Sequence, residues 1–190
     1  TLMSSNKNIY IGAMSGTSHD AIDVSITEIG KGITLKSFFS KRIPSSIRMR
    51  IKNIMESDSA NLIELGQLNK KIGHLFAQAI NESIKKAKLK KSRINCVAIS
   101  GQTIRHEVSN TNPFSMQIGD PNIVSNKTGL TVISDFRNMH ISLGGEGAPL
   151  VPEFHNELFH EARKSKIILN IGGIANYSYI KNKNYLWGSD

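Results

Sequence analysis

Residues 9–26 read IYIGAMSGTSHDAIDVSI, in which two apolar segments flank a polar turn. Ile9 to Ala13 predicts a short strand. Beyond the turn, apolar residues at positions 22, 24 and 26 alternate with polar ones, which is the period of a strand with one buried face. A glycine turn at 30–32 and a third apolar segment at 33–39 follow. We therefore expect an antiparallel meander of three strands.

The turn at residues 14–20 has a composition suited to phosphate. Gly16 lets backbone N–H groups approach phosphate oxygens, and three hydroxyl side chains add donors: Ser15, Thr17 and Ser18. The carboxylates of Asp20 and Asp23 are of a type able to hold a metal ion through water. The Gly-Lys-[Ser/Thr] ending of the Walker A motif is missing. From composition alone, a phosphate-binding turn and a plain polar hairpin turn are equally supported.

Helices and further strands follow the meander. Apolar spacing predicts helices at 45–56, 60–87, 121–128 and 151–163, and strands at 94–100, 114–118 and 130–134. The strand–glycine turn–strand pattern then returns, with strands at 167–170 and 175–180 around Gly172-Gly173 and a third at 185–187. This order predicts an α/β chain with two related domains. We place the first domain at residues 1–165 and the start of a second at 166–190.

Composition excludes several classes of protein. The 190 residues carry a formal net charge of +9, but the basic residues are scattered. The cluster at 85–93 lacks interleaved aromatic residues, so we expect a solvated helix end and no nucleic-acid partner. Cys96 is the single cysteine, which excludes a disulfide within the chain, and we expect it to be a buried small residue. No apolar run approaches the roughly 18 residues of a membrane span. We expect a cytoplasmic protein without a membrane partner.

Six ordered segments covering nearly the whole chain resemble the anhydro-N-acetylmuramic acid kinase family, a branch of the actin–hexokinase–sugar-kinase superfamily. They are Met14-Ser15-Gly16-Thr17-Ser18, Gly101-Gln102-Thr103-Ile104-Arg105-His106-Glu107, Gln117-Ile118-Gly119-Asp120, Asp135-Phe136-Arg137, Gly144-Gly145-Glu146-Gly147-Ala148-Pro149-Leu150-Val151-Pro152 and Asn170-Ile171-Gly172-Gly173-Ile174-Ala175-Asn176. The resemblance implies an actin-like, ribonuclease H-like ATPase fold, with one complete N-terminal domain and the first strands of a second.

The resemblance also implies an activity. This is the ATP- and Mg²⁺-dependent opening of 1,6-anhydro-N-acetylmuramic acid by water, with phosphorylation to N-acetylmuramic acid 6-phosphate in peptidoglycan recycling. The implied ATP contacts are Gly16, Thr17, Ser18, His19, Asp20, Ala21, Ile22, Asp23, Asn170, Gly172 and Gly173. The implied sugar contacts are Gln102, Asp135 and Arg137. Asp190 matches the general base. For Arg137 a structural pair with Asp135 or Asp120 is an equal alternative, and no metal ligand is assigned.

The chain departs from the family pattern at several positions: His19, Ala21, Ser100, Asn138, Met139 and His140. Members of the family are also about twice as long, so we expect no detectable activity from these 190 residues alone. The alternative is a non-catalytic remnant that binds sugar weakly or dimerises. A basic nucleic-acid-binding protein is a weaker third hypothesis. Apolar side chains around Ile167 to Trp187 are expected to lie exposed and to favour a homodimer.

Overall fold

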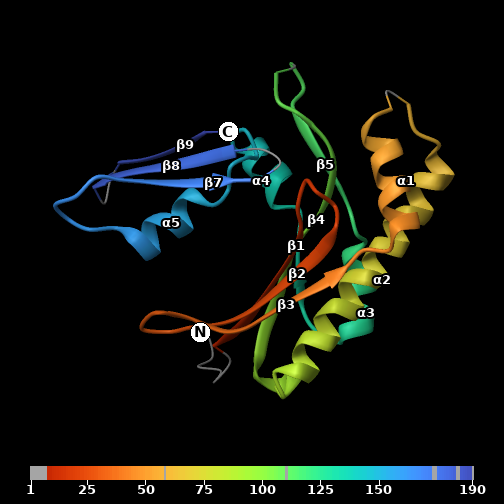
Figure 1. Ribbon diagram of the computed structural model, residues 1–190, viewed down its shortest axis with the longest axis horizontal. Helices are drawn as coiled ribbons and strands as arrows, with labels where there is room; N and C mark the ends of the chain where they lie inside the picture. Colours follow the sequence, from red (N-terminus) through yellow and green to blue (C-terminus); the bar gives the residue numbers. More distant parts are fainter. Residues whose placement is uncertain (1–7, 58, 110, 173–174, 183–184, 190) are drawn as a thin grey trace. The chain divides into compact units, whose positions relative to one another are not determined.

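The computed structural model describes residues 8–57, 59–109, 111–172, 175–182 and 185–189. The larger of its two sheets has six strands (Figure 1). They are β1 (Ile9–Ser15), β2 (Ala21–Ile29), β3 (Ile33–Arg42), β4 (Ile94–Glu107), β5 (Phe114–Ile118) and β6 (Val132–Ile133). The order is β3-β2-β1-β4-β5, and β6 also pairs with β4. β1 to β3 are antiparallel, which confirms the predicted meander, whereas β4 is parallel to β1 and β6.

Helices cover the sheet face that carries the buried residues of β2. α1 (Ser45–Met55), α2 (Leu62–Lys86) and α3 (Pro121–Thr128) were all predicted, and α2 packs against β1, β2 and β3 (Figure 1). Asn61 caps α2 by accepting from the N–H groups of Ile63 and Glu64. Four side chains on one face of α2 are fully buried: Leu68, Ile72, Phe76 and Ile80. A single-turn 3₁₀ helix, Lys91–Arg93, leads into β4.

Three antiparallel strands followed by parallel strands, with helices between them, form the actin-like, ribonuclease H-like ATPase topology. The predicted fold class is confirmed for this part of the chain. The sequence produces this fold because β1, β2 and β4 each carry apolar residues at alternating positions. These residues pack against the apolar stripe of α2.

Several features of the structure differ from the predictions, and α5 and β6 are also shorter than expected. β4 continues through Gly101 to Glu107, because Gly101 adopts a left-handed φ of 69° and forms a bulge rather than ending the strand. A short helix, α4 (Phe136–Ser142), follows the left-handed Asp135 and was not predicted. Cys96 is half-buried, because it lies on the sheet face away from α2.

A smaller antiparallel sheet has the order β7-β8-β9 and consists of β7 (Lys166–Ile171), β8 (Ala175–Asn182) and β9 (Tyr185–Ser189). α5 (Pro152–Phe159) packs against β8 and β9, over the buried residues Ser178 and Ile180. Along β7, in contrast, Ile167, Leu169 and Ile171 are 67%, 58% and 77% exposed. The predicted exposed apolar surface is therefore present at these three residues.

The chain forms two compact units. Unit 1 holds the described residues up to His106 together with Met116–Asp135, and unit 2 holds Glu107–Ser115 and the described residues from Phe136 onward. The predicted domain boundary between residues 165 and 166 marks where the strand pattern restarts, and it stays a prediction. In the described part of the chain, every helix is too short or too polar to cross a membrane.

Candidate functional site

The turn between β1 and β2 is held by backbone hydrogen bonds, and its tip at Gly16 faces open space. The N–H of His19 donates to the carbonyl of Gly16 at 3.0 Å, and the carbonyl of Asp20 accepts from the N–H of Ile43 at 2.8 Å. A Cβ atom placed on Gly16 would meet no heavy atom within 4 Å. The backbone around Gly16 is therefore fixed in place and reachable by an incoming phosphate.

The hydroxyl groups of the turn are used differently from what the sequence suggested. The expectation that Ser15 donates to phosphate is wrong: its side chain is buried, and its hydroxyl is 2.7 Å from Oε1 of Gln102 and 3.0 Å from the carbonyl of Ala21. Ser18 donates to the carboxylate of Asp20 at 2.5 Å. Thr17 is exposed, so its hydroxyl and the backbone amides are the donors that best suit a phosphate.

Asp20 gives the turn a negative charge. The hydrogen bond from Ser18 is the main cause that lowers the pKa of Asp20, so the carboxylate is ionised at neutral pH. A phosphate at the turn would be repelled by this charge unless a cation lay between them. Within the described part of the chain, no group of three His, Cys, Asp or Glu side chains forms a ready metal site.

The remaining predicted contacts in β2 lie beyond the turn. Ile22 is fully buried in the core, so only its backbone is able to face a ligand. Asp23 is half-buried and pairs with Met14 and Ser40 across the sheet.

Gln102 is brought directly to this turn. It is 1% exposed, and its Nε2 donates to the carbonyls of Gly16 at 3.3 Å and Thr103 at 3.1 Å. Its Oε1 accepts from Ser15. The sequence assigned Gln102 to the sugar by resemblance, and it did not indicate this link to the turn.

The other two predicted sugar contacts lie in different units. Asp135 is exposed at the end of unit 1 with a left-handed φ of 64°, which Asp tolerates better than most residues. Arg137 lies in α4 of unit 2, where its Nη1 donates to the carbonyl of Gly147 at 2.8 Å. At least this nitrogen of Arg137 therefore has a structural role. The sugar contacts of both residues stay predictions.

The second glycine turn belongs to unit 2. Asn170 pairs with Asn176 between β7 and β8, and Gly172 is exposed at the bend after β7. Gly173 and Asp190, the predicted phosphate contact and general base, lie outside the described residues.

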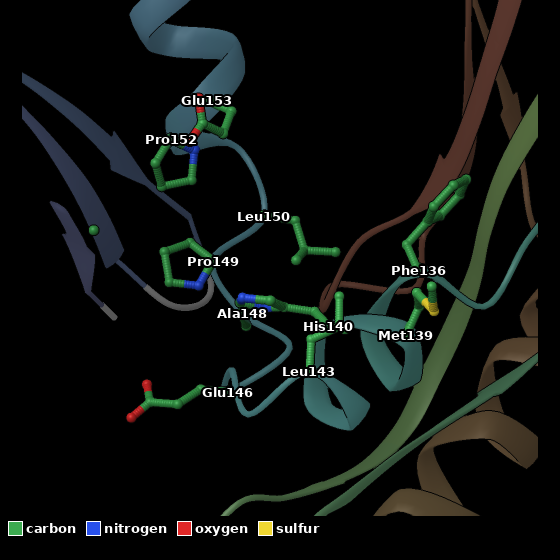
Figure 2. Close-up of a pocket in the computed structure, with 11 residues that line it drawn as sticks. Phe136, Met139, His140, Leu143, Glu146, Ala148, Pro149, Leu150, Pro152 and Glu153 are labelled. Atoms are coloured by element: carbon green, nitrogen blue, oxygen red, sulfur yellow. The ribbon is translucent and has the colours of Figure 1, made fainter. Parts of the chain in front are cut away.

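Unit 2 contains a cavity of about 500 Å³, a volume typical of small-molecule sites. Figure 2 shows α4 on one side of it and the glycine-rich segment with the start of α5 on the other. The lining is mostly apolar: Phe136, Met139, His140, Leu143, Glu146, Ala148, Pro149, Leu150, Pro152, Glu153 and Gly188. Sequence analysis missed this cavity, although the run of glycines at 144–147 was a signal for close backbone packing.

His140 organises the glycine-rich wall of the cavity. Its Nδ1 accepts from the N–H of Gly147 at 3.1 Å. A Cβ atom on Gly145 would lie 2.1 Å from its Nε2, so a side chain there would collide with the ring. Asn138 pairs with both backbone groups of Ser115, at 2.9 and 2.7 Å. Two of the departures from the family pattern, Asn138 and His140, thus have structural partners.

Comparison with known proteins identifies the family of this chain. The profile of the anhydro-N-acetylmuramic acid kinase family matches residues 8–190. The chain belongs to the anhydro-N-acetylmuramic acid kinase family. Two of its curated relatives, both named anhydro-N-acetylmuramic acid kinase, come from Gamma-proteobacterium EBAC31A08 and Vibrio cholerae serotype O1. They are 63% and 38% identical over 185 residues, which is 97% of this chain and 51% and 50% of theirs. The chain spans about half the length of the curated relatives it matches.

A solved structure supports the fold of this family member. A reductive activator for a corrinoid, iron-sulfur protein superimposes with a TM-score of 0.53 and covers 98% of this chain, although it is 14% identical. The match covers 31% of that larger chain. At this identity the likeness concerns the fold alone.

Proposed function

We propose that this chain supplies the phosphate-binding turn of an ATP-dependent kinase that opens and phosphorylates 1,6-anhydro-N-acetylmuramic acid. The observation that carries the proposal is the turn at Gly16, which is held by its own backbone hydrogen bond and leaves open space at its tip, in a chain that belongs to this kinase family. Phosphoryl transfer depends mainly on positioning the phosphates and neutralising their charge, and fixed backbone amides serve both purposes.

ATP and Mg²⁺ fit the turn for different reasons. The turn offers backbone amides, the Thr17 hydroxyl and open space at Gly16 to the phosphates. The ionised Asp20 favours a cation beside them, and Mg²⁺ usually binds through one or two carboxylates together with phosphates. When bound, ATP would supply the phosphoryl group and Mg²⁺ would spread its charge.

The remaining roles are proposed from the family. Asp135 and Arg137 contact the sugar, Asn170, Gly172 and Gly173 contact phosphate, and Asp190 accepts the proton of the attacking water. For the 190-residue polypeptide on its own we propose no detectable turnover. Phosphoryl transfer requires a closed complex that excludes bulk water while keeping the one reacting water, and the chain spans about half the length of the curated relatives it matches. Nucleotide binding is therefore the activity to measure on this chain.

The decisive experiment is titration of the purified chain with Mg-ATP by calorimetry. Gly16→Ala adds a methyl group where the protein leaves open space, so the fold should be kept while phosphate is obstructed. Gly30→Ala is the matched control, because Gly30 lies in the β2–β3 turn with equally open surroundings. We expect Gly16→Ala to weaken binding about tenfold, or ~1.4 kcal/mol, and Gly30→Ala to leave it unchanged. Equal binding by both variants would refute the proposal.

We also propose that the chain forms a homodimer. Ile167, Leu169 and Ile171 form an exposed apolar row on β7, which we call the β7 row. Exposed apolar surface of this kind favours association, and a second copy brings an identical row.

A further inference from the structure

We propose that Gln102 is a positioning residue for the phosphate turn: it aims the Thr17 N–H outward by holding the carbonyl of Gly16. The inference rests on the proposed function of the turn, and it replaces direct sugar contact as the role of Gln102. It is carried by the hydrogen bonds of one buried amide.

The hydrogen-bonding capacity of Gln102 is largely used inside unit 1. A glutamine amide has two N–H donors and one carbonyl acceptor with two lone pairs. Here the donors face the carbonyls of Gly16 and Thr103, and the carbonyl accepts from Ser15. Because the side chain is 1% exposed, a sugar would have to displace these partners to reach it.

The strand bulge explains how Gln102 reaches the turn. Along the parallel β1–β4 pair, Ala13 is opposite Ile99 but Ser15 is opposite Gln102, so β4 carries one extra residue. Gly101 absorbs it with its left-handed φ of 69°. A side chain at 101 would also collide with the carbonyl of Ile118, 2.8 Å from the expected Cβ position. The bulge therefore places Gln102 beside Ser15.

Peptide geometry links this bond to phosphate binding. In a trans peptide the C=O and the following N–H point in opposite directions. The carbonyl of Gly16 is held by two donors, the N–H of His19 and Nε2 of Gln102. Since Gln102 lies in the interior, the N–H of Thr17 must point away from the interior. Gln102 thus determines the direction of an amide that phosphate requires.

The test compares three variants of the whole chain. Gln102→Met keeps the approximate volume and removes all three hydrogen bonds, and Gln102→Glu keeps only the acceptor. Gln117→Met is the matched control, because the Gln117 amide donates to Oγ1 of Thr103 at 3.3 Å, in the same strand as Gln102. Two properties are measured: amide hydrogen exchange at His19 by NMR, without nucleotide, and affinity for Mg-ATP. The amide of Gly119, bonded to Asn69, is the internal reference for exchange.

We expect exchange at His19 to become about fivefold faster in both Gln102 variants, since the bonded carbonyl of Gly16 loses one of its two anchors. Affinity for Mg-ATP should fall by a similar factor in these variants. Gln117→Met should change neither the exchange at His19 nor the affinity, and exchange at Gly119 should stay the same in both Gln102 variants. If Gln102→Met fails to fold, exchange at His19 in Gln102→Glu carries the test, because the added negative charge of Glu would by itself weaken Mg-ATP binding.

Unchanged exchange at His19 would overturn the positioning role, whatever the affinity. Faster exchange without Mg-ATP binding by the parent chain would instead leave the positioning role standing and refute the proposed function. Loss of affinity with unchanged exchange would mean that Gln102 contacts the ligand directly, which also overturns the inference.

Discussion

The two glycine turns of this chain lie in hairpins with the same sequence pattern but very different surroundings. Around the first, β1 and β2 contribute Ile9, Ile11, Ile22, Val24 and Ile26 to a core in which each is no more than 1% exposed. Around the second, the β7 row lies open, and Ile180 is the one fully buried apolar side chain among the described residues of unit 2. A shared strand–turn–strand pattern therefore does not make an equally packed domain.

The difference comes from the helices that cover each sheet. α2 presents a long apolar stripe to β1–β3, whereas α5 is short and covers the Ser178 and Ile180 side of the small sheet. Burial contributes about 25 cal/mol per Å² of apolar surface, so unit 1 gains far more stability from its hairpin than unit 2 does. The difference between the two units can be tested by four predictions, from the largest expected effect to the smallest.

The largest effect is expected from Phe76→Ala in α2. Phe76 is fully buried in the core that β1 and β2 also form, so the cavity should lower the free energy of unfolding by about 3–5 kcal/mol. Leu169→Ala on the β7 row, measured at a concentration low enough to keep the chain monomeric, should change it by less than about 0.5 kcal/mol, because Leu169 is 58% exposed. Urea unfolding followed by NMR of each unit provides both values. Similar losses in the two variants would contradict the contrast.

The next effect concerns self-association. The double variant Ile167→Lys, Leu169→Lys places charges on the β7 row and should weaken a homodimer at least about tenfold, or ~1.4 kcal/mol. Leu35→Lys is the control, since Leu35 is 61% exposed on β3 of unit 1. Light scattering over a concentration series gives the mass. A parent chain that stays monomeric at high concentration would refute the homodimer, and a dimer unaffected by the double variant would refute the β7 row as its interface.

A smaller effect is expected from pH acting on unit 2. Burial lowers the pKa of His155, whose Nδ1 lies 2.9 Å from Oγ of Ser178. The unfolded chain, with an ordinary value of 6.5, then takes up the proton first as pH falls. Stability of unit 2 is therefore complete above about pH 6.5 and is lost as pH falls through the folded pKa.

The expected loss in the free energy of unfolding is about 1 kcal/mol, which is the usual contribution of one hydrogen bond such as that to Ser178. Thermal unfolding of the parent chain and of His155→Gln, measured from pH 7.5 to 5.5, checks this prediction. His74→Gln is the control, because His74 is exposed on α2 of unit 1. A pH dependence that persists in His155→Gln would assign it to another group.

Most of the fold followed from periodicity, whereas the fine structure of the site did not. The alternation at Ile22, Val24 and Ile26 and the long apolar stripe of α2 are summed over many residues, which makes them strong signals. The bulge at Gly101 depends on one residue and its partner strands, so the same glycine was interpreted as a strand end. α4 has seven residues and no buried side chain, which leaves little periodicity to detect.

The candidate site shows the same limit. The composition of the turn indicated phosphate, and the turn is indeed open at Gly16. Whether a hydroxyl faces outward is decided by its neighbours in space, and Ser15 faces Gln102, which is 87 positions away in the sequence. No local pattern contains that information. The cavity beside His140 likewise depends on how Gly145 and Gly147 fold back on α4.

The smallest expected effect concerns two carboxyl groups, one in each unit, whose pKa values are lowered by different causes. In unit 2, Glu161 has its pKa lowered to about 2 from 4.5, chiefly by the hydrogen bonds and charges of Lys164 and Lys166, whose Nζ atoms lie 2.8 and 2.5 Å away. In unit 1, the pKa of Asp20 is lowered mainly by the neutral hydroxyl of Ser18. These pairs are exposed, so we expect little change in unfolding from either, and the carboxyl titration itself is the sensitive measurement.

Salt should distinguish the two causes. Raising ionic strength from about 0.1 to 1 M shortens the Debye length from about 10 to 3 Å, which screens charges but leaves a hydrogen bond between neighbouring groups. Carboxyl ¹³C NMR should show the pKa of Glu161 rising towards 4.5 in high salt, while that of Asp20 stays lowered. Ser18→Ala should raise the pKa of Asp20 at either salt concentration, and Lys164→Gln should raise that of Glu161. Because the stabilising form is the ionised one, any contribution of Glu161 is present above its unfolded pKa and is lost as pH falls towards 2. An Asp20 that responds to salt as strongly as Glu161 would show that charge, rather than Ser18, determines the electrostatics of the phosphate turn.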